Sequence, residues 1–283
     1  EWNTYFDYLA PPLRPHAYAA FEYAYSVVFC ADATRVNWMP VLENHNYRVI
    51  RDGLNEARFA ARAARWSPSQ ARAHLGISNT DVVAVLVGTV CDRKGQIDLV
   101  HALGMLSDSA ASRVRVFIVG DRGGEYSEKV HDAVSVLPSE RRGRVHVVKE
   151  TSDPYLYFRA ADISVCTSRI ESYPRVILEA MACGLPIIST AVFGIVEQVR
   201  DGVNALFYEQ GRHAELASKL EQLVLDEAMR KRMADNSIHV LRSLTSFEEM
   251  LDGFQQLFGE LGALPTNSAD EDVVAGIERG AVR

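Results

Sequence analysis

The chain is 283 residues long, which suits one large domain or two small ones. Its hydrophobic content of 48% and charged content of 24% are typical of a folded, soluble protein and exclude a disordered chain. The net charge of -7 argues against binding to duplex nucleic acid, which needs clustered positive charge. No apolar run approaches the roughly 20 residues that cross a bilayer, and no segment resembles a signal peptide.

Cysteine and histidine usage points to no metal or redox centre. The four cysteines show no metal-ligand spacing and lie mostly in apolar runs, which indicates a reduced, cytosolic chain. The eight histidines fall in no Ser-His-Asp order, so structural or surface roles are expected for them. The sequence opens with Glu1 rather than Met, and we therefore expect a piece of a longer protein.

The first residues of the chain differ in pattern from the rest. Helix, strand, helix and strand are expected in turn over residues 14–25, 27–30, 32–42 and 47–50. The dipeptide Asp52-Gly53 then marks a turn. We interpret residues 1–54 as the remnant of an N-terminal domain with its linker. The many aromatic residues fit packing against that domain; a membrane-interface or acceptor-binding surface is the alternative.

The helix expected over residues 55–65 carries Arg58, Arg62 and Arg65 on one face, at spacings of four and three. A solvated helix face is the simpler interpretation. The alternative is a peripheral contact with anionic lipid head groups at the inner face of a membrane.

From residue 81 onward, short apolar runs alternate with helical patterns of roughly 10–15 residues. The runs are nearly continuous in apolar character, as strands buried on both faces require. They are residues 82–87, 114–119, 145–148, 163–166, 186–189 and 205–207. This alternation predicts an α/β fold with a doubly wound parallel sheet, and we assign residues 55–262 to one Rossmann-like domain. The polar residues 263–283 are expected to form a flexible tail.

Capping patterns mark two helix starts in this region. Ser67-Pro68-Ser69-Gln70 offers an N-cap serine, a proline at the first helical position and a glutamine at the third. Asp153-Pro154 repeats the arrangement of a capping residue followed by proline.

The stretch from Glu171 to Thr190 carries the chemistry. A strand is expected to end near Thr167, and a helix to begin around Tyr173 or Pro174, with Gly184 as its left-handed cap. The start of a helix just beyond the carboxyl end of a parallel strand favours anions, because its first N–H groups lack intrahelical partners. A diphosphate bound at this helix start would have the Glu171 carboxylate at the mouth of its site.

Glu171 stands at the mouth of this site, and Glu179 lies five or six residues into the expected helix, roughly 8–9 Å further along at 1.5 Å per residue. That separation suits two hydroxyl-bearing groups of one ligand and does not suit a shared proton. The alternative is that Glu171 interacts with the helix dipole while Glu179 is a solvated helical residue. The spacing does not decide between the two.

In its residue order, this stretch resembles the family 4 retaining glycosyltransferases, which have two glutamates separated by seven residues. In that family Glu-Ala-small-Ala-x-Gly-x-Pro and a strand follow, and residues 179–190 match this order with Met181 at the small position. The resemblance extends to residues 88–95 and 201–204 and covers roughly residues 26–262. It implies the C-terminal, nucleotide-sugar-binding half of the two-domain GT-B architecture.

The resemblance also implies roles for individual residues. Glu171 would accept hydrogen bonds from hydroxyls of the donor sugar, and Glu179 would hold the ribose. The backbone N–H groups of Ser172, Tyr173 and Arg175 would meet the diphosphate.

The first strand end supplies the rest of the expected site. Lys94 would sit against the phosphates as a positive charge, close to Gly88. The family often has arginine where this chain has Thr89, and we expect Arg93 to supply the second charge instead. Glu150, just past a later strand, would lie near the base.

The function implied is transfer of a sugar from a nucleoside diphosphate donor to a hydroxyl acceptor, with retention at the anomeric carbon and without metal or cofactor. The acceptor would be a glycan, a lipid or a small molecule. An acceptor-side base would come from the other domain, so this chain alone is expected to bind donor and transfer poorly. The alternatives are a nucleotide-sugar-binding module without turnover, and an epimerase or phosphorylase on the same architecture.

Overall fold

A computed structural model describes residue 12 and residues 14–38 and 46–262. The predicted tail at 263–283, residues 1–11 and the end of the helix predicted over residues 32–42 lie outside these residues. Within the described part of the chain, no helix is both long and apolar enough to span a membrane.

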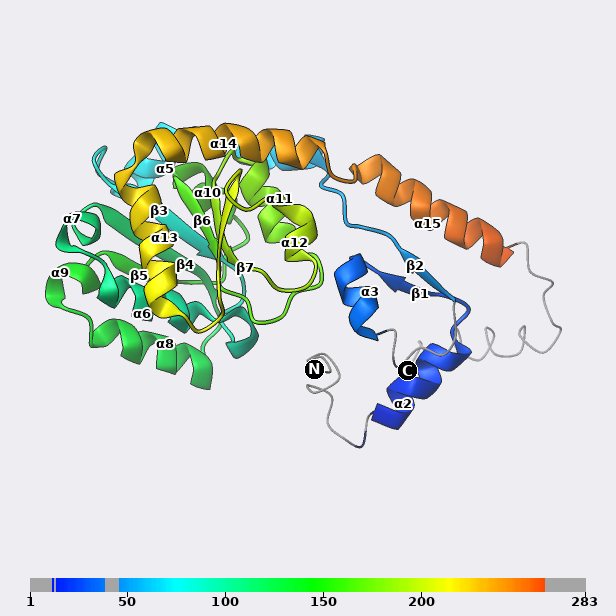
Figure 1. Ribbon diagram of the computed structural model, residues 1–283. Helices are drawn as coiled ribbons and strands as arrows, with labels where there is room; N and C mark the ends of the chain where they lie inside the picture. The colour runs from blue at the N-terminus through cyan, green and yellow to red at the C-terminus, as the bar shows by residue number, and fades with distance from the viewer. Residues whose placement is uncertain (1–11, 13, 39–45, 263–283) are drawn as a thin grey trace, which may run out of the picture.

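A six-stranded parallel sheet with helices on both faces forms the main body (Figure 1). Its strand order is β5-β4-β3-β6-β7-β8. The strands are β3 Val82–Val87, β4 Val114–Asp121, β5 Val145–Lys149, β6 Ile163–Cys166, β7 Ile187–Thr190 and β8 Ala205–Tyr208. The predicted doubly wound fold is confirmed. The first and last residues of each predicted strand lie within two residues of those observed.

Each central strand is apolar throughout because it packs against two cores. Val82, Ala84 and Leu86 of β3 point to one core, and Val83 and Val85 point to the other. The first core lies under α6, α8 and α13, and the second lies under α4, α5, α10 and α11. These helices are α4 Glu56–Ala63, α5 Pro68–His74, α6 Gln96–Met105, α8 Glu125–Ser135, α10 Tyr155–Ala160, α11 Arg175–Ala182 and α13 His213–Leu225.

Shorter helical turns lie in the connections between strands, and one long helix reaches both cores. The turns are η2 Asp92–Lys94, α7 Asp108–Ala111, α9 Ser139–Arg142 and α12 Ile195–Gln198, and the long helix is α14 Glu227–Arg242. Helix α14 contributes Met233 to the first core and Val240 to the second.

One of the two predicted caps is confirmed. Ser67 accepts a hydrogen bond from the Gln70 backbone N–H, and the Gln70 side chain accepts one from the Ser67 backbone, a complete capping box for α5. The prediction for Asp153 is wrong. Pro154 is itself the N-cap of α10, and the Asp153 carboxylate accepts instead from the indole N–H of Trp66, at 3.0 Å.

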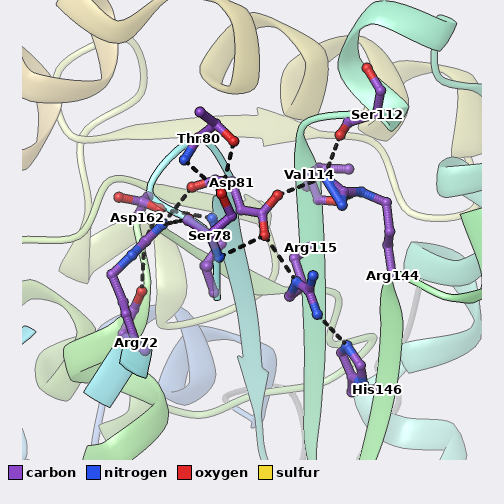
Figure 2. Close-up of polar contacts among 12 residues, drawn as sticks. Arg72, Ser78, Thr80, Asp81, Ser112, Val114, Arg115, Arg144, His146 and Asp162 are labelled. Atoms are coloured by element: carbon purple, nitrogen blue, oxygen red, sulfur yellow. Dashed lines mark hydrogen bonds and ion pairs between the residues drawn. The ribbon is translucent and has the colours of Figure 1, made fainter. Parts of the chain in front are cut away.

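A polar network ties together the amino ends of β3, β4 and β6 (Figure 2). The buried Asp81 carboxylate accepts hydrogen bonds from Arg115 Nε at 3.2 Å and Arg144 Nη2 at 2.7 Å. Asp162 accepts from Arg72 Nη1 at 3.0 Å and from the backbone N–H of Val83 at 2.8 Å. The charges at this edge of the sheet are paired with one another, which indicates a structural role for them.

The described N-terminal residues form a small separate sheet with flanking helices. Strands β1 Val27–Phe29 and β2 Tyr47–Val49 pair in parallel, beside α2 Arg14–Tyr23 and α3 Asp32–Trp38. Helix α15, Phe247–Gly262, follows α14 and lies beside these strands (Figure 1). Gly253 of α15 packs on the Ile50 side chain, and Glu260 pairs with Arg48. The chain therefore crosses from the main sheet back to its N-terminal residues, while the predicted boundary at residue 54 stays a prediction.

Two of the three arginines predicted to share one helix face contact neighbouring side chains, although α4 ends at Ala63 and Arg65 lies just beyond it. Arg62 lies over the Tyr155 ring, 6.0 Å from its centroid, and Arg65 is 3.8 Å from the Asp153 carboxylate. All three side chains are exposed, as a solvated helix face requires.

Candidate functional site

The strand order places the candidate site. From β3 the chain proceeds outward through β4 and β5, then returns to β6 on the other side of β3 and proceeds through β7 and β8. In open α/β sheets, ligands bind at such a switch point, outside the carboxyl ends of the strands. The loops that follow β3 and β6 meet there, and they carry Lys94 and Glu171.

Backbone and side-chain hydrogen bonds hold these two loops together. The Thr167 hydroxyl donates to the Lys94 carbonyl at 2.8 Å, and the Arg169 N–H donates to the Arg93 carbonyl at 2.8 Å. Arg93 Nη1 donates in turn to the Ile170 carbonyl at 3.1 Å. The positions of Arg93 and Lys94 are therefore fixed relative to the loop that carries Glu171.

Gly95 makes this close approach possible. Its φ of +65° lies in the left-handed region, and a Cβ atom there would stand 2.4 Å from the Thr167 carbonyl oxygen. The Lys94 side chain extends back over Gly88, so two of the residues predicted for the site lie in contact.

The Glu171 carboxylate is the centre of the cluster. Its side chain is 8% exposed, and Oε1 accepts a hydrogen bond from the Ser168 hydroxyl at 2.9 Å. Arg93 Nη1 lies 3.2 Å from the same oxygen, and Lys94 Nζ forms a close ion pair with it. Two cations and one carboxylate give the cluster a local charge of about +1.

Helix α11 begins beside this cluster, with Pro174 as its N-cap residue. The helix thus starts at Arg175, at most two residues later than predicted. Ser172 and Tyr173 lie in the turn that leads into it, and Tyr173 is buried. Burial raises the pKa of the Tyr173 phenol to about 12, so this phenol stays neutral at physiological pH.

Glu179 occupies the fifth position of α11 and is partly buried. Burial raises the pKa of its carboxyl above the usual glutamate value, while the nearby Arg175 charge lowers it. Glu179 is thus less exposed than the alternative of a solvated helical residue requires. A half-buried carboxylate is suited to accept hydrogen bonds from ligand hydroxyls.

The raised pKa of Glu179 predicts a pH effect on stability. Between the usual glutamate pKa and the raised value, the folded protein holds a proton that the unfolded chain has lost, so stability falls as pH rises through this window. Glu179→Gln, which mimics the neutral form, should remove this contribution. Denaturant titrations between about pH 4 and pH 7 should show the wild type losing stability relative to the variant as pH rises. A constant difference would contradict the account.

Two other predicted residues take no part in the cluster. Glu150 is exposed after β5 and pairs with Arg122. Thr89 is exposed, and its carbonyl accepts a hydrogen bond from the Gln96 side chain at 2.9 Å. The structure thus brings Gly88, Arg93, Lys94 and Glu171 together, while the role of Arg93 as a second charge on the phosphates stays a prediction.

A contact with the N-terminal residues borders the site. Glu197 of α12 accepts from the Ala33 N–H at 2.7 Å and from Arg51 Nε at 2.9 Å. Gly194, at the start of α12, is wedged between Ser172 and Ala31. The N-terminal unit is therefore linked through α12 to the turn before α11.

Replacing Gly194 by alanine tests this contact. Its φ of -69° suits any residue, but a Cβ atom would stand 1.7 Å from the Ser172 carbonyl oxygen and 2.7 Å from the Ala31 Cβ. Gly194→Ala should therefore destabilise the fold by about 2–3 kcal/mol in denaturant titrations, through overpacking. Gly259→Ala on α15 is the matched control, because nothing lies within 4 Å of its Cβ position. An equally small effect of both substitutions would refute the tight contact.

The chain matches the model of a known family, described as "Glycosyl transferases group 1", over residues 69–240. This match covers more than half of the chain. The chain belongs to the group 1 glycosyl transferases. The predicted resemblance to family 4 and the GT-B fold are thereby confirmed.

Curated relatives and solved structures agree with this assignment. A "D-inositol 3-phosphate glycosyltransferase" of Salinispora arenicola is 29% identical over 249 residues, 81% of this chain and 50% of the relative. A "Lipopolysaccharide core biosynthesis glycosyltransferase LpsE" of Rhizobium meliloti is 31% identical, over 66% of this chain and 52% of the relative. The structure of Anabaena HepE in complex with UDP-glucose superposes with a TM-score of 0.78 at 23% identity, covering 93% of this chain and 71% of HepE. The chain spans about half the length of the curated relatives it matches.

Sequence reasoning missed Ser168 and the link between Arg51 and Glu197. Ser168 stands three residues before Glu171, a spacing at which a side chain in a tight loop can reach back. Arg51 and Glu197 are separated by 146 residues, and no local pattern connects them.

Proposed function

We propose that this glycosyl transferase takes its sugar from a nucleoside diphosphate donor bound at the carboxyl edge between β3 and β6. The observation that carries the proposal is the convergence of Lys94 and Arg93 on Glu171 at the switch point of the sheet. The start of α11 adds backbone N–H groups and the positive end of its dipole. A diphosphate is the ligand group that best fits two cations beside a helix N-terminus.

Within this proposal each residue has a defined task. Lys94 and Arg93 stabilise the negative charge on the departing diphosphate, which is the main catalytic contribution. Glu171 accepts a hydrogen bond from a sugar hydroxyl, Glu179 from the ribose, and the turn from Ser172 to Arg175 contacts the phosphates. Glu150 lies toward the base. We propose that the reaction needs no metal or other cofactor, because these protein cations take the charge.

The finer features of the reaction are also proposals. Retention at the anomeric carbon is supported by the resemblance to family 4. A uridine donor is the first candidate, since HepE binds UDP-glucose. The acceptor is a hydroxyl of a glycan, a lipid or a small molecule, and the relatives named for inositol 3-phosphate make a phosphorylated cyclitol the first compound to try. No role for nucleic acid is proposed.

Calorimetric titration with nucleotides and nucleotide sugars tests the donor site. The panel contains UDP, GDP and ADP together with UDP-glucose, GDP-mannose and ADP-glucose. We expect binding of one base class, weakened at least tenfold, or about 1.4 kcal/mol, by Glu179→Ala. A folded chain that binds none of the six ligands would refute the donor site.

A binding module without turnover is the second candidate. The observation in its favour is Thr89, an exposed neutral residue where family members often have arginine. Thr89→Arg separates the two, since a donor site limited by missing charge should bind the diphosphate more tightly in this variant. Donor hydrolysis by the wild type, measured as released glucose, would exclude the binding module.

We also propose a cytoplasmic location. More specifically, we propose a peripheral membrane contact through Arg58, Arg62 and Arg65. Co-sedimentation with vesicles of anionic lipid, compared for the wild type and Arg58→Glu, tests the contact. Equal sedimentation of both proteins would show that this helix face does not contact the membrane.

A further inference from the structure

The Glu171 carboxylate already holds the two cations that the proposed function assigns to the diphosphate. Lys94 and Arg93 both reach its Oε1 atom. Because the Glu171 side chain is 8% exposed and that of Lys94 is 15% exposed, water screens the ion pair between them little, whereas the Arg93 side chain is 43% exposed and its ion pair is screened more. A phosphate that binds Lys94 and Arg93 must therefore share them with a negative charge at close range.

The two oxygens of this carboxylate have different surroundings. Lys94 and the Ser168 hydroxyl donate hydrogen bonds to Oε1, and Arg93 Nη1 forms an ion pair with the same oxygen at 3.2 Å. Within residues 14–38 and 46–262, no hydrogen bond reaches Oε2. These partners occupy Oε1, while Oε2 is the acceptor left for a hydroxyl.

Ser168 is itself held in place from behind. It is buried, and its carbonyl accepts a hydrogen bond from the Thr190 hydroxyl at 2.6 Å. The Ser168 side chain therefore orients the Glu171 carboxylate from a fixed backbone position, and we treat Ser168 as a positioning residue.

Donor and product differ at the point that faces this carboxylate. In a nucleoside diphosphate sugar the terminal phosphate is an ester with a single negative charge, and sugar hydroxyls can donate to Oε2. In the bare nucleoside diphosphate, the terminal phosphate carries up to one further negative charge at neutral pH, since its second pKa is about 6. No sugar hydroxyl then compensates the carboxylate.

We propose that Glu171 determines the preference of the site for the sugar-bearing donor over the bare nucleoside diphosphate, and so promotes product release. This inference rests on the proposed function. In the transfer, the bond between the anomeric carbon and the terminal phosphate oxygen breaks, and its electron pair stays on that oxygen. The acceptor oxygen forms the new bond to the carbon, and its proton passes to solvent. The new charge on phosphate arises beside Glu171, which repels it.

The test compares the dissociation constants of UDP and UDP-glucose by calorimetry, with the GDP and GDP-mannose or ADP and ADP-glucose pair used if another base binds. Glu171→Gln should lower the ratio of the UDP to the UDP-glucose constant at least tenfold. UDP binding should tighten, because Lys94 and Arg93 are no longer paired with a negative charge in the protein. A merely structural role for Glu171 would weaken both ligands alike.

Two further variants keep the result interpretable. Glu179→Gln is the matched control, since the ribose belongs to both ligands and the ratio should stay within about twofold. Ser168→Ala, a small change in the core, should lower the ratio about threefold by releasing the Glu171 carboxylate. An unchanged ratio in both the Glu171 and Ser168 variants, with wild type binding UDP-glucose, would overturn the inference and leave the proposed function standing. Absence of binding to every ligand pair would overturn both.

Discussion

Lys94→Ala is expected to weaken binding of both the nucleoside diphosphate and its sugar ester at least tenfold, or about 1.4 kcal/mol. The Lys94 side chain is 15% exposed and packs over Gly88, so its charge acts at short range with little screening. The diphosphate is common to both ligands, so both should lose affinity, and the bare diphosphate, which carries more charge, should lose at least as much as the sugar ester. This result has the opposite sign to that of Glu171→Gln, which should tighten the bare diphosphate.

Lys129→Ala is the matched control for Lys94→Ala. Lys129 lies on α8, where its exposed side chain pairs with Glu125. Loss of one such surface charge should change the affinity less than twofold, because solvent and salt screen it. An equal loss of affinity in both variants would mean that overall charge, and not the cluster at Glu171, attracts the ligand.

Asp81→Ala is expected to cause the largest loss of stability, about 3 kcal/mol. The Asp81 side chain is 5% exposed and accepts hydrogen bonds from Arg115 and Arg144 (Figure 2). Removing the carboxylate leaves both guanidinium groups largely buried without their counter-charge. Urea titrations of the wild type and the variant would measure the difference in the free energy of unfolding.

Asp108→Ala provides the comparison for Asp81→Ala, since Asp108 is fully exposed in its pair with Arg141. Its loss should change the free energy of unfolding by less than about 1 kcal/mol. Donor affinity of the folded Asp81→Ala protein should stay unchanged, because the network lies at the amino edge of the sheet. If the folded Asp81→Ala protein lost donor binding without losing stability, the donor site would lie at the amino edge of the sheet and the account would be contradicted.

Much of the fold could be predicted from the sequence because its signals are local. Runs such as Val82–Val87 are apolar throughout, which strands buried on both faces require. The end of α11 followed from Gly184, whose φ is +65°. That Lys94 and Glu171 belong to one site followed only from the resemblance, and their direct ion pair was not predicted, since 77 residues separate them.

Other features depend on tertiary contacts that no local pattern encodes. Asp153 precedes a proline as a capping residue would, yet its carboxylate accepts a hydrogen bond from the indole N–H of Trp66, 87 residues away. The link between Arg51 and Glu197 and the packing of α15 on Ile50 join distant segments in the same way. Spacing alone could not show that Glu179 is partly buried, because burial depends on which neighbours the fold supplies.

Amide hydrogen–deuterium exchange, with and without the nucleoside diphosphate that binds in the calorimetric panel, tests the position of the donor site most directly. The account predicts slower exchange in residues 88–95 and 172–177, and loss of this protection in Lys94→Ala. Protection confined to another surface, such as the groove lined by Met105, Ala217 and Leu225, would contradict it.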